Sequence, residues 1–144
     1  MPADCLFCAI ASGAVAASIV LETPDALAFL DHRPLFPGHC LLIPRTHYDN
    51  MLDFPASALG SLFAQARTLA VAMEDALAAE GTFVAVNNRV SQSVPHLHVH
   101  IVPRRRKDGL KGFFWPRGKY RDESEMEAVR AALRTAVERL RPES

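Results

Sequence analysis

The residues with the clearest chemical potential are three histidines that alternate along one short segment. His96, His98 and His100 are separated by single apolar residues. Because side chains alternate across a β-strand, this spacing predicts that the three imidazoles project from one face of a strand. Each ring has two nitrogens that need a partner or water, so simply solvated or core-satisfied histidines are the less favoured interpretation. Clustered imidazoles indicate nucleophilic, proton-transfer or metal chemistry.

Two of the three cysteines form a second group that could do chemistry. Cys5 and Cys8 have the Cys-x2-Cys spacing that can supply two thiolates to a tetrahedral ion, although two ordinary buried thiols are the alternative. Cys40 lies in a predicted strand and is expected in the core. A rival metal hypothesis makes His96 and His98 ligands of a catalytic ion, but no carboxylate-bearing metal motif accompanies them.

Composition restricts the partners that this chain can have. Its 144 residues correspond to about one domain, so a single domain over residues 1–144 is the simplest prediction. Sixteen Lys plus Arg balance sixteen Asp plus Glu, which removes the electrostatic argument for nucleic-acid or membrane binding. Three cysteines are too few for a disulfide scaffold, and no signal peptide or bilayer-spanning run is evident. A cytoplasmic location is therefore expected.

The elements that must position these residues follow from periodicity and from Pro and Gly punctuation. Apolar residues at three- and four-residue steps predict a helix that begins near Asp53 or Pro55 and ends at Gly81. Asp122 and Glu125 predict a capping box for a C-terminal helix over residues 122–141. The connections between strands are mostly too short for parallel crossovers, which favours an antiparallel α+β domain of about five strands and two main helices. The expected strands are 19–21, 26–31, 39–43, 82–86 and 96–102, the last ended by Pro103.

A basic and aromatic segment, 104–121, has neither helical nor strand periodicity and is expected to be a long surface loop. Its run 104–107 (Arg-Arg-Arg-Lys) could bind a polyphosphate tail. Its run 113–115 (Phe-Phe-Trp) could stack on a base or cover the mouth of a partner subunit's site. A solvated basic loop with an aromatic anchor is an equally good interpretation.

Residues 92–103 resemble the signature of the histidine triad (HIT) family, in which His-x-His-x-His follows Gln-Ser/Thr-Val and the x positions are apolar. The segments 5–8, 28–31 and 37–44, together with His47, also fall in the family's order and spacing. The resemblance covers roughly residues 4–103, and the motifs are specific in combination.

The resemblance implies nucleotidyl transfer, as in a bacterial dinucleoside polyphosphate hydrolase or a nucleoside phosphoramidase. His98 would attack the α-phosphate and form a covalent nucleotidyl intermediate, from which a nucleoside monophosphate is released. The carbonyl of His96 would accept a hydrogen bond from the other ring nitrogen of His98, and His39 and His100 would border the phosphate. A related phosphorylase, or a regulatory nucleotide-binding module with little turnover, are the alternatives.

The same resemblance assigns nucleotide contacts. Asp31 would accept from the ribose hydroxyls, Asn87 would contact the ribose–phosphate portion, and Gln92 and Ser93 would donate to phosphate oxygens beside His98 and His100. For Asp31 and Asn87, a simple turn or strand-end role is the alternative. A purine nucleotide or dinucleoside polyphosphate is the expected ligand, and Phe29 is expected in the core.

The resemblance also implies a metal and a quaternary structure. In many bacterial-type relatives two cysteines combine with two histidines, which here gives Cys5, Cys8, His47 and His96 as ligands of a structural zinc ion. Family members are usually homodimers, so a homodimer is expected.

The match departs from the family pattern at two places. The loop between Asn87 and His96 is about two residues shorter than usual and lacks glycines, and Arg89 could compensate by reaching the phosphates. His32 follows Asp31 where an apolar residue is common, and it has no assigned role.

Overall fold

The computed structural model describes residues 4–110 and 117–141, so the aromatic run 113–115 lies outside the described residues. The chain forms two compact units that divide after Asp108. The first unit contains the predicted catalytic and metal-ligating residues and the predicted nucleotide contacts up to Arg104. The second contains α3 (Glu123–Leu140), which is described by itself.

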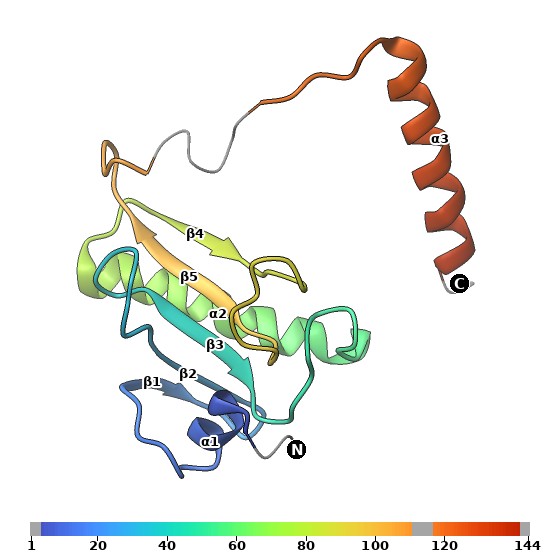
Figure 1. The fold of residues 1–144 in the computed structure, drawn as a ribbon. Helices are drawn as coiled ribbons and strands as arrows, with labels where there is room; N and C mark the ends of the chain where they lie inside the picture. The colour runs from blue at the N-terminus through green and yellow to red at the C-terminus, as the bar shows by residue number, and fades with distance from the viewer. Residues whose placement is uncertain (1–3, 111–116, 142–144) are drawn as a thin grey trace. The chain divides into compact units, whose positions relative to one another are not determined.

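The first unit is built on a five-stranded antiparallel sheet of order β1-β2-β3-β5-β4 (Figure 1). The expected antiparallel α+β class is therefore confirmed. A short turn joins β1 to β2, a longer loop over residues 31–39 joins β2 to β3, and α2 (Ala56–Leu77) lies in the connection from β3 to β4. The strands are β1 (Ile19–Glu22), β2 (Ala26–Leu30), β3 (Cys40–Pro44), β4 (Gly81–Ala85) and β5 (Val99–Arg104).

Apolar residues on both sheet faces form two core clusters, because alternate side chains point to opposite faces. Ala28, Leu42 and Val99 pack on one face against the apolar stripe of α2. Phe29 and Leu41, their neighbours along β2 and β3, pack on the other face with α1 (Leu6–Ala11). The expected core positions of Phe29 and Cys40 are confirmed. The sheet thus lies between α2 on one face and α1 on the other.

The strand that carries the histidines begins later than the sequence pattern predicts. β5 starts at Val99, so His96 and His98 precede it, and it continues through Pro103 to Arg104. β3 pairs with β5 only from Val99 to Ile101, so Pro103 lies beyond this ladder, where a missing N–H does not break the β3 pairing. Alternation nevertheless begins before the strand, because Leu97 packs in the same core cluster as Val99 while His98 faces the pocket.

The helix boundaries also differ from the expectations. α2 ends at Leu77 and Ala78 takes a left-handed conformation at the C-cap, whereas Gly81 is the first residue of β4. The six-residue α1 is not predicted by the sequence pattern, because it is too short to show periodicity. The N-cap of α3 is as expected: the Glu125 N–H donates to the Asp122 carboxylate at 2.8 Å. None of the described helices has the length and apolarity needed to cross a bilayer.

The start of the basic segment follows β5 and is held by local partners. Arg104, Arg105 and Arg106 all contact acceptors within the first unit, at the end of β5 that is farther along the chain from the three histidines. Their guanidinium groups are therefore paired with acceptors of the protein itself, although the three arginines line one pocket together with Glu80 and Gly81. The partners are Asp108 for Arg104, the carbonyl of Leu77 for Arg105 and Glu80 for Arg106.

Gly38 is a position at which this fold requires glycine. Its φ is +102°, and a Cβ there would lie 2.5 Å from Cδ1 of Leu77. We expect Gly38→Ala to lower the free energy of unfolding by about 1–3 kcal/mol, measured by urea denaturation, because alanine is strained at this positive φ. Gly60 is an exposed residue within α2 with open space around it, so Gly60→Ala is the control and should stabilise by about 1 kcal/mol. Equal effects of the two substitutions would contradict this interpretation.

Candidate active site and metal centre

A pocket of about 590 Å³ lies between α1 and the sheet face that α1 covers. Apolar side chains from α1 and the segment after it make up much of its wall, and polar side chains from three separate segments complete it. A pocket of this volume, with a largely apolar wall and a few polar side chains, is typical of small-molecule binding sites. The polar wall consists of Ser18, Asp31, His32, Ser93, His98 and His100.

His98 is a buried imidazole with one nitrogen fixed by the backbone. Its Nδ1 lies 2.8 Å from the carbonyl oxygen of His96, and because a carbonyl only accepts, Nδ1 carries the proton. Nε2 is then the nitrogen with a free lone pair. Burial lowers the pKa of His98 below its ordinary value, although the His96 carbonyl opposes this shift. The edge of the Phe7 ring packs on it, with centroids 5.1 Å apart. His98 is thus a neutral imidazole at pH 7, with a free lone pair on Nε2.

A chain of hydrogen bonds sets the protonation of the other two histidines in the pocket region. The Leu35 N–H donates to Nδ1 of His39 at 3.1 Å, so Nε2 of the neutral His39 ring carries its hydrogen. That Nε2 lies 3.0 Å from Nδ1 of His100 and donates to it, which leaves His100 with a hydrogen on Nε2. Burial, and then His98 and His39, lower the pKa of His100 to about 4. His100 is therefore a neutral N–H donor at the pocket.

Asp31 lies at the end of β2 and lines the same pocket. One carboxylate oxygen accepts from the Arg33 N–H at 2.9 Å, which holds the side chain in a turn. The other lies 3.8 Å from Nε2 of His39. The carboxylate is thus oriented by the backbone while it faces the pocket, so the turn and binding interpretations are compatible.

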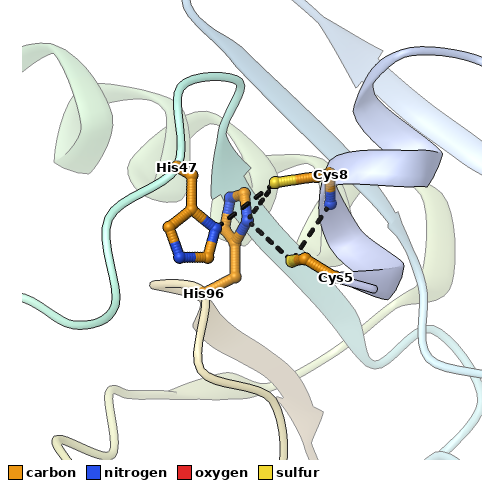
Figure 2. Close-up of side chains that lie close together, drawn as sticks. All are labelled: Cys5, Cys8, His47 and His96. Atoms are coloured by element: carbon orange, nitrogen blue, oxygen red, sulfur yellow. Dashed lines mark hydrogen bonds between the residues drawn. The ribbon is translucent and has the colours of Figure 1, made fainter. Parts of the chain in front are cut away.

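The side chains of the four predicted metal ligands point toward one another, as Figure 2 shows. Cys5 and Cys8 come from the start of α1, His47 from the loop after β3, and His96 from the segment before β5. One ligand atom from each residue lies within 4.8 Å of all the others. Three segments that are far apart in the sequence therefore present a compact Cys2His2 set.

The chemistry of this donor set fits zinc. Nε2 of His96 donates to the Pro44 carbonyl at 2.9 Å, and Nε2 of His47 lies 2.8 Å from the Asp49 carboxylate. Both Nδ1 lone pairs therefore face the thiols, at 3.3 Å from His47 to Cys8 and 3.5 Å from His96 to both sulfurs. Burial, followed by the neighbouring Cys5, raises the pKa of Cys8 to about 11 without a metal. A cation is what would stabilise two thiolates there.

A second group with the right spacing fits a metal less well. Asp31, His39 and His100 also offer ligand atoms within 4.8 Å of one another. However, the Leu35 N–H occupies Nδ1 of His39, so Nε2 carries a hydrogen and has no lone pair for an ion. The rival pairing of His96 with His98 also lacks support, because the free nitrogen of His96 faces the cysteine thiols instead.

The remaining predicted nucleotide contacts are distributed unevenly. Ser93 lines the pocket. Asn87 is half-buried and is not part of the pocket wall. The amide of Gln92 donates to the Asp49 carbonyl and accepts from the Arg89 N–H at 2.9 Å, and Gln92 is not part of the wall either. The loop that lacks glycines is shaped by non-glycine residues in the left-handed region, with φ of +70° at Arg89 and +62° at Ser91.

Several groups that orient the site were not identified from the sequence. The Leu35 N–H and the Pro44 carbonyl are backbone atoms, for which the sequence carries no signal. Asp49 could have been identified from the sequence, because a carboxylate two residues after His47 can reach Nε2 of that histidine.

The lowered pKa of His100 predicts how stability depends on pH. The unfolded chain binds a proton at His100 near pH 6.5 and the folded chain only near pH 4, so acidification between these values favours unfolding. We expect protonation of this residue to lower the free energy of unfolding by about 3 kcal/mol over that range. Urea denaturation from pH 7.5 to 4 should show a shallower loss in His100→Asn than in the wild type. Parallel curves for the two proteins would contradict the assignment.

Comparison with known proteins places this geometry in a family. The HIT domain matches residues 12–107. An uncharacterized HIT-like protein of Saccharolobus solfataricus is 39% identical over 101 residues, which are 69% of this chain and 73% of that protein. An adenylylsulfatase of Arabidopsis thaliana is 32% identical over 109 residues, 74% of this chain and 55% of that protein. An asymmetrical bis(5′-nucleosyl)-tetraphosphatase of Schizosaccharomyces pombe is 32% identical over 96 residues, 65% of this chain and 53% of that protein.

Solved structures agree with the fold. A Streptococcus mutans protein superposes with a TM-score of 0.86 at 32% identity, covering 95% of this chain and 87% of that one. A zinc-bound histidine triad family protein of Mycobacterium smegmatis superposes with a TM-score of 0.72 at 36% identity, covering 92% and 97%. The matched signature, the shared fold and the arrangement of the histidines lead to one conclusion: this chain belongs to the HIT family.

Proposed function

We propose that this protein is a nucleotide hydrolase or nucleotidyl transferase that works through a covalent intermediate on His98. The observation that carries the proposal is the state of this side chain. A neutral imidazole lines the pocket, its Nδ1–H is held by the His96 carbonyl, and its Nε2 has a lone pair. A binding module would not need a nucleophile prepared in this way.

The proposed reaction has two displacements at the α-phosphorus. In the first, the lone pair on Nε2 of His98 forms a bond to phosphorus while the bond to the leaving group breaks, and the leaving group takes a proton from solvent. In the second, water attacks phosphorus and gives up a proton to solvent, the electron pair of the N–P bond returns to Nε2 of His98, and a nucleoside monophosphate is released. Two easier displacements thus replace one difficult direct attack by water, because a phosphorylated imidazole is a good leaving group.

Neighbouring side chains would supply the charge stabilisation that this reaction needs. The Nε2–H of His100, held in that tautomer by His39, would donate to a phosphate oxygen, as would the Ser93 hydroxyl. Asp31 would accept from the ribose hydroxyls. These donors are fixed before substrate arrives, so they need little reorganisation during the reaction.

The relatives support a substrate with a nucleoside attached to an activated phosphate. One is named for cleavage of an adenylyl sulfate and another for cleavage of a dinucleoside tetraphosphate. Dinucleoside polyphosphates and nucleoside phosphoramidates present the same α-phosphorus to His98, so we propose this class of substrates.

We propose a structural zinc ion at Cys5, Cys8, His47 and His96. When bound, zinc would supply four bonds that tie the start of α1 to the segment carrying the nucleophile. Asp49 and the Pro44 carbonyl would hold the two imidazoles in the ligating tautomer. The zinc-bound relative from Mycobacterium smegmatis supports the proposal.

The nucleophile can be tested by substitution. His98→Ala should lower the release of AMP from adenosine phosphoramidate or diadenosine tetraphosphate by about 10⁴-fold or more, because no other group occupies its place. AMP binding, measured by calorimetry, should persist and serves as the control for folding. Turnover near the wild-type rate in His98→Ala would contradict the mechanism. Adding inorganic phosphate separates the acceptors, since a phosphorylase would release ADP in place of AMP.

The metal centre predicts one zinc ion per chain in freshly purified protein, measured by elemental analysis. Cys8→Ser should remove most of the zinc and lower the midpoint of thermal unfolding, because the bound metal contributes folding free energy. Cys40→Ser is the matched control, since Cys40 lies in the core away from the four ligands and should leave the zinc content unchanged. Zinc-free wild-type protein, or equal zinc loss in both variants, would contradict the assignment.

A further inference from the structure

Gln92 connects the loop that carries His47 to the loop that carries Ser93. Its Nε2 donates to the Asp49 carbonyl, and its Oε1 accepts from the Arg89 N–H at 2.9 Å. The two partners determine the orientation of the amide, because a carbonyl can only accept and an N–H can only donate. We call residues 47–51 the metal loop and residues 87–93 the phosphate loop.

Two further hydrogen bonds hold the same region together. The Met51 N–H of the metal loop donates to the Asn88 side chain of the phosphate loop at 3.0 Å. Just beyond the phosphate loop, the Leu97 N–H donates to the Tyr48 carbonyl at 2.7 Å. Two hydrogen bonds thus join the two loops, and a third joins the metal loop to the segment after the phosphate loop. The Gln92 side chain makes the connection that adjoins Ser93.

A continuous set of contacts therefore runs from the proposed metal site to the pocket. Nε2 of His47 lies 2.8 Å from the Asp49 carboxylate, and the carbonyl of Asp49 holds Gln92. Ser93, the next residue, lines the pocket that contains His98. Gln92 itself is half-buried and is not part of that wall.

We infer that Gln92 is a positioning residue that couples the metal loop to the phosphate loop, so that zinc binding at His47 and phosphate binding beside Ser93 strengthen each other. The inference rests on the proposed function for the identity of both ligands. It departs from the expected role of Gln92 as a direct phosphate donor. By linkage, whatever factor zinc adds to nucleotide affinity, the nucleotide adds to zinc affinity.

The test compares zinc affinity, measured by competition with a chromophoric chelator, in the presence and absence of saturating AMP. In the wild type we expect AMP to tighten zinc binding by about 5-fold or more. In Gln92→Ala we expect zinc binding without AMP to weaken by about 10-fold, because the orientation of Asp49 and His47 is relaxed. The tightening by AMP should also diminish. Gln92→Met, which keeps the length of the side chain but neither polar group, should behave in the same way and serves if the alanine variant does not fold.

Val90→Ala is the matched control. Val90 lies in the same loop, its side chain is 81% exposed, and its substitution should change neither zinc affinity nor the effect of AMP. If Gln92→Ala binds zinc as the wild type does and loses only AMP affinity, Gln92 contacts the phosphate directly and the inference is overturned. An equal loss of zinc affinity in Val90→Ala would also overturn it. Neither measurement uses turnover, so the result is independent of the test of His98 as nucleophile.

Discussion

The site depends on one fully buried residue, His96, which makes three different polar interactions. Its Nε2 donates to the Pro44 carbonyl at the end of β3, its Nδ1 faces the thiols of Cys5 and Cys8, and its own carbonyl accepts from His98. A buried imidazole is costly unless both nitrogens are satisfied. The first two contacts leave one arrangement for the ring, and the third fixes the orientation of the His98 ring. The proposed metal site and the pocket that His98 lines therefore share one anchoring residue.

Burial and backbone partners, more than charged side chains, prepare this site for an anion. His39, His98 and His100 are all neutral, because burial lowers the pKa of each. Their tautomers follow from the Leu35 N–H and the His96 carbonyl, which are parts of the main chain. This agrees with the zero net charge of the chain. A phosphate would meet fixed N–H and hydroxyl donors, while the arginines at the end of β5 are engaged elsewhere.

Much of the site was predictable because strand alternation is a local property. The spacing of His96, His98 and His100 places the last two on the pocket face although β5 begins only at Val99. The Cys-x2-Cys pair was equally visible, but the helix that presents it was not, because six residues are too few for a periodic signal. The contacts of Gln92, in contrast, could not be predicted from the sequence. Its place in the signature suggested a phosphate contact, whereas its partners, Asp49 and Arg89, are set by how two loops meet.

The sequence by itself determined the order of the strands along the chain, the two-faced pattern of the core and the residue types available for chemistry. These depend on periods of two and of about three and a half residues, and on turn residues, all of which act over short distances. Only the tertiary structure decided which nitrogen of each histidine holds a proton, which cysteines and histidines converge, and what Gln92 touches. Those outcomes depend on main-chain atoms brought together from distant segments, and main-chain atoms are the same at nearly every position of a sequence.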